Sequence, residues 1–314
     1  MGAESWPLPW QQAQWAGLVE SRANGQLPHA LLLAGPSGTG KAGFAAHFAQ
    51  LVLCASPGSQ PCGQCRHCHL VAAGSHPDLV RVQPLESSKA IRIDQIRELR
   101  EFCAGRPHQA GWRVILIEPA EALNNNAANA LLKTLEEPGS DTLLMLVAHE
   151  PSRLPATVRS RCRSLRFPAP EPALALAWLR DRLPEADPEP LLRAAGGRPL
   201  RALALADPGA AAQVARLREL AIAVAAGSVA PAAAAAESAR FDWMLAADTL
   251  TALLVEEVKA AVTAGKPPVP AQFDCFDALI DRRRVLAVSP NLNAELLWNG
   301  LWLEWRRAAA VAGG

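Results

Sequence analysis

Residues 35–42 read GPSGTGKA, which closely approaches the pattern of a loop that holds nucleotide phosphates. In the full pattern, G-x-x-x-x-G-K is followed by Ser or Thr: backbone N–H groups cradle the phosphates, the lysine reaches the outer phosphates, and the hydroxyl binds Mg²⁺. Gly35, Gly38, Gly40 and Lys41 are present, but Ala42 occupies the hydroxyl position. The sequence therefore predicts a phosphate loop that lacks its side-chain magnesium ligand.

The surroundings of the loop favour this interpretation over a chance cluster of glycines. An apolar run, HALLLAG at 29–35, precedes the loop, and a helical pattern follows it. A strand, a glycine-rich loop and a helix N-terminus in this order direct backbone N–H groups at an anion. An ordinary tight turn is the alternative, and a loop that is related to nucleotide-binding loops but has lost its metal is a third interpretation.

A second catalytic element is incomplete at the end of a later apolar run, VILIEPAEAL at 114–123. Proteins with such loops normally place an Asp here to hold the metal, followed by a Glu that polarises the attacking water. Glu118 could still reach a metal, but Pro119 has no carboxylate to act as a base, and Glu121 lies three positions beyond Glu118. We therefore predict that this chain does not hydrolyse ATP, and its binding of ATP or ADP stays in doubt.

Four cysteines have the spacing of a metal site. Cys54, Cys62, Cys65 and Cys68 form C-x7-C-x2-C-x2-C, so that three sulfurs can converge on one ion and Cys54 can complete a tetrahedron. Four protein ligands leave no open coordination position on the ion. We therefore predict a structural Zn²⁺ rather than a catalytic one.

Other interpretations of these cysteines remain open. They are an iron–sulfur site, ligation by His67 or His69 in place of one sulfur, and thiols without a metal. The isolated Cys103, Cys162 and Cys275 are expected to be buried apolar residues.

Length and charge limit the broad class of the protein. With 314 residues and a formal net charge of +1, the chain is long enough for two or three domains and carries no strong field toward nucleic acid. No apolar run is long enough to span a bilayer, and no export signal is visible at the N-terminus. We expect a cytoplasmic protein without a membrane partner that does not bind DNA alone.

The pattern of elements predicts an α/β region followed by helices. Short apolar runs alternate with helical patterns as far as Phe167, which is typical of a doubly wound parallel sheet. Beyond PAPEP at 168–172, strand signals vanish; the Ala-rich segment 231–237 and GKPPVP at 265–270 are expected to interrupt the helical remainder. The predicted domains are 1–167, 168–207 and 208–314.

Two further groups of side chains have two interpretations each. Arg159, Arg161 and Arg163 precede the last strand, and on their own they are more typical of a solvated face than of a contact with a neighbour's phosphates. Trp298, Trp302 and Trp305 share one helix face, which favours core packing over a partner surface. The first 165 residues contain five longer motifs: HALLLAGPSGTGK, CGQCRHC, HPDLV, NALLKTLEEP and EPSRLPATVRSRC.

These motifs resemble, in the same order, the bacterial DNA polymerase III clamp-loader subunits of the AAA+ group, and LLKTLEEP with SRC is highly specific for them. The resemblance implies an AAA+ P-loop domain with a zinc module, a small helical lid and a C-terminal all-α collar that joins five subunits. It also implies that Arg161 acts in trans on the γ-phosphate held by an adjacent ATPase subunit. The family's lid arginine is replaced by Leu200, with Arg201 one position away.

The departures from the full nucleotide-binding pattern distinguish between the clamp-loader families. Gamma and tau subunits keep the hydroxyl and the acidic pair, whereas Ala42 and Pro119 favour the delta-prime family. The resemblance then implies a non-hydrolysing scaffold that works with gamma/tau and delta subunits in a heteropentameric ring and helps to load a sliding clamp onto primed DNA. An active ATPase subunit and a free-standing zinc-dependent DNA-binding module are the competing hypotheses.

Overall fold

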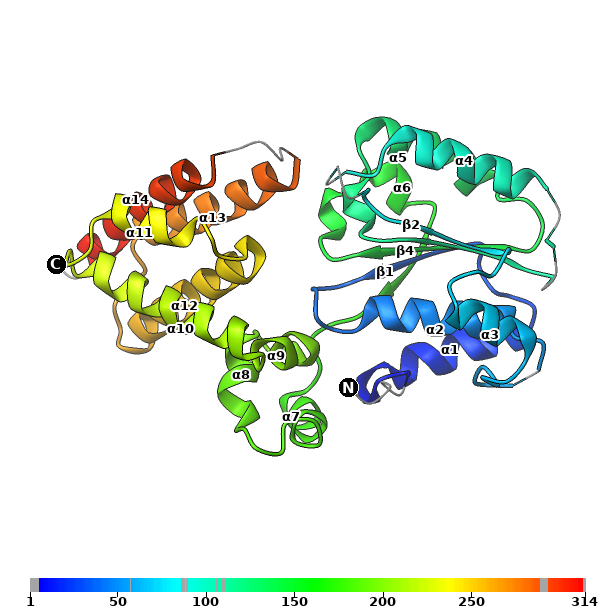
Figure 1. Ribbon diagram of the computed structural model, residues 1–314, viewed down its shortest axis with the longest axis horizontal. Coiled ribbons are helices and arrows are strands. Elements are labelled where there is room, and N and C mark those ends of the chain that lie inside the picture. Colours follow the sequence, from blue (N-terminus) through cyan, green and yellow to red (C-terminus); the bar gives the residue numbers. More distant parts are fainter. Residues whose placement is uncertain are drawn as a thin grey trace. The chain divides into compact units, whose positions relative to one another are not determined.

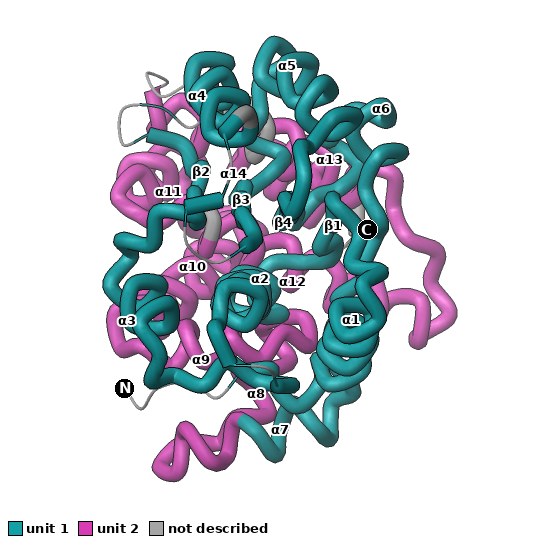
Figure 2. Tube along the Cα trace, turned by 90° about the vertical axis from the view of Figure 1, so that its right-hand side faces the viewer, with its two compact units in different colours: residues 1–178 teal, residues 179–314 magenta. Residues whose placement is uncertain are grey.

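The chain forms two compact units, Met1–Trp178 and Leu179–Gly314, which are distinguished by colour in Figure 2. The structure is a computed structural model, and it describes residues 6–56, 58–85, 88, 90–105, 107–108, 111–288 and 293–312. The unit boundary falls within helix α7, Pro172–Arg180. The predicted division into three domains at 167 and 207 stays a prediction.

The first unit is built on a five-stranded parallel sheet in the order β2-β3-β4-β1-β5. The predicted parallel sheet is thereby confirmed. Its strands are β1 Ala30–Ala34, β2 Leu79–Val82, β3 Arg113–Ile117, β4 Thr142–Ala148 and β5 Arg163–Arg166. Because all strands run the same way, the segments after β1, β3 and β4 meet at one edge of the sheet.

Helices cover both faces of this sheet, as Figure 1 shows. One face carries α4 Ile93–Ala104, α5 Asn125–Glu136 and α6 Ala156–Arg159; the other carries α1 Gln12–Ala23, α2 Lys41–Leu53 and α3 Arg66–Ala72. Short 3-10 turns lie at η1 Pro9–Gln11, η2 Ala120–Ala122 and η3 Pro151–Arg153.

Alternation along the strands explains why the sheet has two cores. In β1, Leu32 packs with the core beneath α4 and α5, while Leu31 and Leu33 pack with the core beneath α1 and α2. Successive strand residues point to opposite faces, so a strand that is apolar at every position serves both layers. All five residues of β3 and all seven of β4 are buried accordingly.

The second unit is helical. Beyond α7 it contains α8 Pro188–Ala194, α9 Pro199–Leu205, α10 Pro208–Ala225, α11 Pro231–Ser238, α12 Trp243–Thr263, α13 Pro270–Val288 and α14 Ala294–Ala312. The Ala-rich segment is therefore not an interruption but a helix, because Ala has the highest helix propensity and Pro231 suits the first helical position. The Pro-rich segment 265–270 does separate two helices, α12 and α13.

The tryptophans of α14 belong to the core of this unit. Trp298, Trp302 and Trp305 are each at most 3% exposed. The indole N–H of Trp302 donates to Ser238 Oγ at 3.2 Å, and that of Trp305 donates to the carbonyl of Ala221 at 3.0 Å. The predicted core role of this stripe is confirmed.

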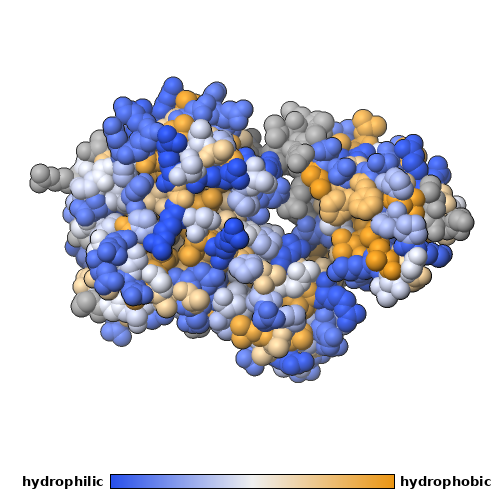
Figure 3. All heavy atoms as spheres, turned by 180° about the vertical axis from the view of Figure 1, so that it is seen from behind, coloured by the Kyte–Doolittle hydropathy of each residue, from blue (hydrophilic) through white to orange (hydrophobic). Residues whose placement is uncertain are grey.

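Polar and apolar side chains are intermingled on the face drawn in Figure 3. Within the described ranges, no helix combines the length and apolar character that crossing a bilayer requires.

Candidate functional site

The glycine-rich loop lies between β1 and α2, at the edge where the strands end. Gly35, Gly38 and Gly40 all have positive φ, at 156°, 80° and 88°, a region that favours glycine. A Cβ on Gly35 would lie 2.1 Å from the carbonyl oxygen of Phe167. The loop therefore needs glycine both for its backbone conformation and for close packing against the segment after β5.

The N-terminal segment packs over the same loop. The indole N–H of Trp10 and the side-chain amide of Gln11 each donate to the carbonyl of Thr39 at 3.0 Å. A Cβ on Gly40 would lie 2.6 Å from Leu8 Cδ1, so the side chain of Leu8 lies directly against the loop. One carbonyl of the loop is thus tied by two donors from a segment about thirty residues earlier.

Trp6 covers the first turn of α2 in a similar way. A Cβ on Gly43 would lie 1.9 Å from Trp6 Cζ2, so the indole ring occupies the space that a larger residue would need. Glycine at this position, which has no part in the phosphate-loop pattern, is explained by the approach of this ring.

Lys41, the candidate phosphate ligand, is directed toward its own loop. Its side chain is buried, and its Nζ donates to the carbonyls of Gly35 and Pro36 at 2.7 Å each. Buried ammonium groups require such partners, because an unpaired charge away from water is costly. The carbonyls therefore partly satisfy the charge that would otherwise be directed at a phosphate.

Glu118 and Ala42 line one small cavity of about 20 Å³, together with Arg81, Gln83 and neighbouring apolar residues. Burial raises the pKa of the Glu118 carboxyl, an effect that Lys41 and Arg81 oppose. The position next to the missing hydroxyl thus contains a carboxylate that is already influenced by two cations. Because a guanidinium repels a divalent ion, Arg81 is an additional obstacle to magnesium at this place.

Glu121 has a structural partner. Its carboxylate accepts hydrogen bonds from the backbone N–H groups of His149 and Glu150, at 3.0 to 3.2 Å. These residues follow β4, so Glu121 fixes the backbone at the end of that strand. Such bonds to a carboxylate are charge-assisted and strong, and they engage the oxygens that a general base would need.

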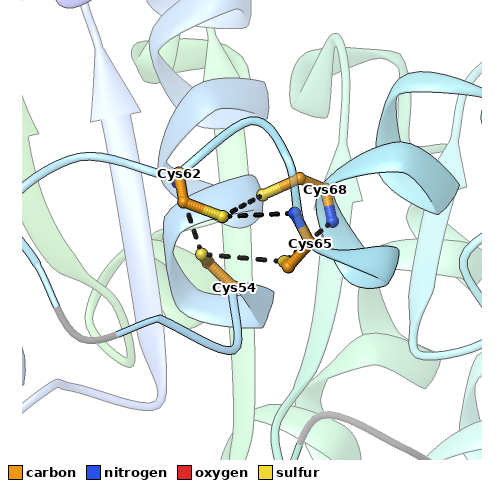
Figure 4. A group of neighbouring side chains, drawn as sticks. All are labelled: Cys54, Cys62, Cys65 and Cys68. Atoms are coloured by element: carbon orange, nitrogen blue, oxygen red, sulfur yellow. Dashed lines mark hydrogen bonds between the residues drawn. The ribbon is translucent and has the colours of Figure 1, made fainter.

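The four predicted metal ligands come together, as Figure 4 shows. Cys54, Cys62, Cys65 and Cys68 place their Sγ atoms within 4.8 Å of one another, and such a group can hold a metal ion. The Cys54–Cys65 and Cys62–Cys68 Sγ distances are both 3.9 Å. An ideal tetrahedron with metal–sulfur bonds of about 2.3 Å has edges of about 3.8 Å, so this geometry fits one tetrahedral ion.

Backbone N–H groups surround the sulfurs. N–H groups of Gln64 and Cys65 lower the pKa of Cys62 to about 6, whereas burial raises the pKa of Cys68 to about 12. The imidazole of His67 is engaged elsewhere, because its Nδ1 lies 3.0 Å from Nε2 of His76. The possible ligand atoms that lie together are four sulfurs, and thiolate ligands suit Zn²⁺.

The isolated cysteines differ in their burial. Cys275 is fully buried, as predicted, but Cys103 and Cys162 are only partly buried. Both partly buried residues pack against the core beneath α4 and α5.

Arg161 lies just beyond α6, and its side chain has defined partners. Its Nε donates to Glu136 Oε1 at 2.7 Å, its Nη2 lies 2.5 Å from the same oxygen, and its Nη1 donates to the carbonyl of Thr157 at 3.0 Å. The side chain remains 36% exposed. The guanidinium thus has a fixed position at the surface of the first unit.

Arg201, the neighbour of the substituted lid position, pairs with an acidic residue of the second unit. Its Nε lies 3.0 Å from Asp248 Oδ2, and Nη2 of Arg198 lies 3.4 Å from the same oxygen. Asp248 is 9% exposed, so both arginines from the region of α9 converge on a nearly buried carboxylate of α12.

Four of these arrangements were not predicted from the sequence. They are the cover of the loop by Trp6 and Trp10, the contact of Glu136 with Arg161, the hydrogen bonds that Glu121 accepts, and the pairing of Asp248 with two arginines. Glu136 stands in LLKTLEEP, a motif that was noted without a role for this residue. The others carry no local signal, because each joins residues far apart in the chain.

The parallel sheet, the strand–loop–helix order and the GxxxxGK loop define the class of P-loop nucleotide-binding folds. Within this class, the model of the family described as DNA polymerase III, delta subunit, matches residues 10–171, and the chain belongs to that family.

Named relatives and a solved structure are similar to the chain. It is 46% identical over 215 residues to DNA polymerase III subunit delta' of Pseudomonas aeruginosa, covering 67% of this chain and 65% of that protein. It is 38% identical over 201 residues to the subunit delta' of Escherichia coli, covering 63% and 60%. The match thus spans less than two thirds of each relative. A gamma subunit-related protein of Thermotoga maritima superposes with a TM-score of 0.48 at 16% identity, covering 93% of this chain and 99% of that one.

Proposed function

We propose that this chain is a non-hydrolysing, delta-prime-type subunit of a DNA polymerase III clamp loader and supplies Arg161 to a neighbouring ATPase subunit. The observation that carries the proposal is a contrast between two cations. Lys41 is buried against carbonyls of its own loop, whereas the side chain of Arg161 is held by Glu136 and Thr157 and remains 36% exposed. The similarity to delta-prime relatives supports the same assignment.

The chain's own nucleotide site supports no hydrolysis. Ala42 provides no oxygen for magnesium, Pro119 no base, and the carboxylate of Glu121 accepts backbone hydrogen bonds. Glu118 shares its cavity with Arg81. These features disfavour the alternative of an active gamma/tau-like ATPase, and we expect Gly35, Gly38, Gly40 and Lys41 to bind ATP or ADP weakly at most.

The ion of the four-cysteine site is proposed to be Zn²⁺ with a structural role. The four sulfurs fill a tetrahedral coordination shell and leave no position for a substrate. The ion would connect the end of α2, through Cys54, to the start of α3, through Cys65 and Cys68. It would thereby fix a segment that has little regular structure of its own.

The proposed partners are gamma/tau and delta subunits in a heteropentameric ring, with a sliding clamp and primed DNA reached through the complex. Under this proposal the helical second unit provides the lid and the collar contacts. The chain works in the cytoplasm, where replication takes place, and its net charge of +1 agrees with DNA contact that is shared among subunits.

Reconstitution of the loader with the Arg161→Ala chain tests the proposal. ATP turnover by the complex should fall by about 10³, the scale of arginine fingers in general, while the complex still assembles. Arg163→Ala is the matched control, because Arg163 is an exposed arginine two residues away. Unchanged turnover with Arg161→Ala would refute the trans role, and ATP hydrolysis by the isolated wild-type chain would favour the ATPase alternative.

A further inference from the structure

The guanidinium of Arg161 is fixed by two elements that pack together. Glu136 is the last residue of α5, and Thr157 lies in α6. The carboxylate oxygen Oε1 of Glu136 accepts from Nε and lies 2.5 Å from Nη2, while the Thr157 carbonyl accepts from Nη1. A side chain with four rotatable bonds is thus held from both sides.

The contacts leave a defined part of the guanidinium open. Arginine has five N–H donors in a planar fork. Nε and Nη1 each donate one hydrogen bond, and Nη2 lies 2.5 Å from Glu136 Oε1 in an ion pair. At least one N–H therefore remains on each terminal nitrogen, and two terminal N–H groups are what bidentate binding of a phosphate requires.

A purely stabilising role for Glu136 agrees poorly with its position. Glu136 and Arg161 are 51% and 36% exposed, and ion pairs at such exposure contribute little to folding. A carboxylate at a helix C-terminus is also disfavoured by the helix dipole. The pair is therefore better explained by what it does to the orientation of the guanidinium than by a gain in stability.

We propose that Glu136 is a positioning residue for Arg161: it holds the guanidinium in the orientation that directs its remaining terminal N–H groups at the phosphate of a neighbouring subunit. The inference rests on the proposed function of Arg161. Without Glu136, the arginine must lose its rotamer freedom during each reaction, and the transition state loses a preorganised donor.

Variants of Glu136 in the reconstituted loader test this role. Glu136→Ala should lower kcat for ATP about fivefold to thirtyfold, with KM for ATP and assembly unchanged, because the arginine contributes mainly in the transition state. Glu136→Gln keeps an acceptor oxygen and should retain most of the activity. Glu137→Ala removes the adjacent exposed carboxylate and should match wild type. The melting temperature of the Glu136→Ala chain should not fall.

A double variant separates positioning from an independent effect. Glu136→Ala should add no further loss to Arg161→Ala, because Glu136 acts through that side chain. Wild-type turnover of Glu136→Ala, or a loss that multiplies with that of Arg161→Ala, would overturn the inference while leaving the proposed function intact. If Arg161→Ala itself has no effect, the proposed function fails first and this inference fails with it.

Discussion

Replacement of Asp248 by alanine should destabilise the second unit by removing the common partner of two arginines. The carboxylate of Asp248 is 9% exposed, and Arg198 and Arg201 are 16% and 18% exposed. Removing one partner from a fully buried ion pair typically costs about 3–5 kcal/mol, since the remaining charge loses its compensation. Here the arginines retain some contact with water, so we expect a loss of about 2–4 kcal/mol.

Urea unfolding of the isolated chain measures this loss as a decrease in the free energy of unfolding. Glu237→Ala is the control: Glu237 also pairs with an arginine, Arg216, at 2.5 Å, but the two side chains are 40% and 47% exposed. An exposed pair contributes about 0–1 kcal/mol. If Asp248→Ala costs no more than Glu237→Ala, burial does not govern this interaction and the reasoning is wrong.

The proposed metal site and the helical core give two further predictions. Cys68→Ser should abolish retention of one zinc ion per chain, measured by elemental analysis. In the wild type, zinc retention should fall as the pH is lowered: burial raises the pKa of Cys68 to about 12, so binding must displace its proton, and acid also protonates the other thiolates. A Cys68→Ser chain that keeps its zinc would contradict the assignment. Trp302→Ala should lower the free energy of unfolding by about 3–5 kcal/mol, whereas Leu296→Ala, at a residue that is 70% exposed on the same helix, should change it by less than about 0.5 kcal/mol. Similar losses for both would show that α14 does not pack as described.

The sheet and the cluster of four cysteines could be predicted because their signals are local. Buried strands appear as continuous apolar runs, and the run at 142–148 corresponds to β4 residue by residue. Likewise, the spacing of Cys62, Cys65 and Cys68 directly limits how far apart their sulfurs can lie. The stripe of tryptophans in α14 was interpreted correctly for the same reason, because one helix face is defined by sequence spacing alone.

The remaining arrangements depend on tertiary contacts that no spacing encodes. Asp248 and Arg201 are 47 positions apart, and Glu136 and Arg161 are 25 apart. Each pair meets only after helices have packed. The prediction for the Ala-rich segment 231–237 was wrong for a different reason. A proline followed by alanines was interpreted as a break between helices, although proline at the first turn starts a helix and alanine extends it.

Packing explains the glycines of the loop and of the first turn of α2 without any nucleotide chemistry. Gly35 is required by its approach to Phe167, Gly40 by its positive φ and its contact with Leu8, and Gly43 by the ring of Trp6. Larger side chains at these positions would push apart the N-terminal segment, α2 and the end of the sheet. A loop that resembles a phosphate site can therefore be maintained by packing alone, and its sequence by itself is no evidence that a phosphate binds there. Position 42, by contrast, lines a small cavity, so packing does not require a side-chain hydroxyl there. The residue at this position is alanine.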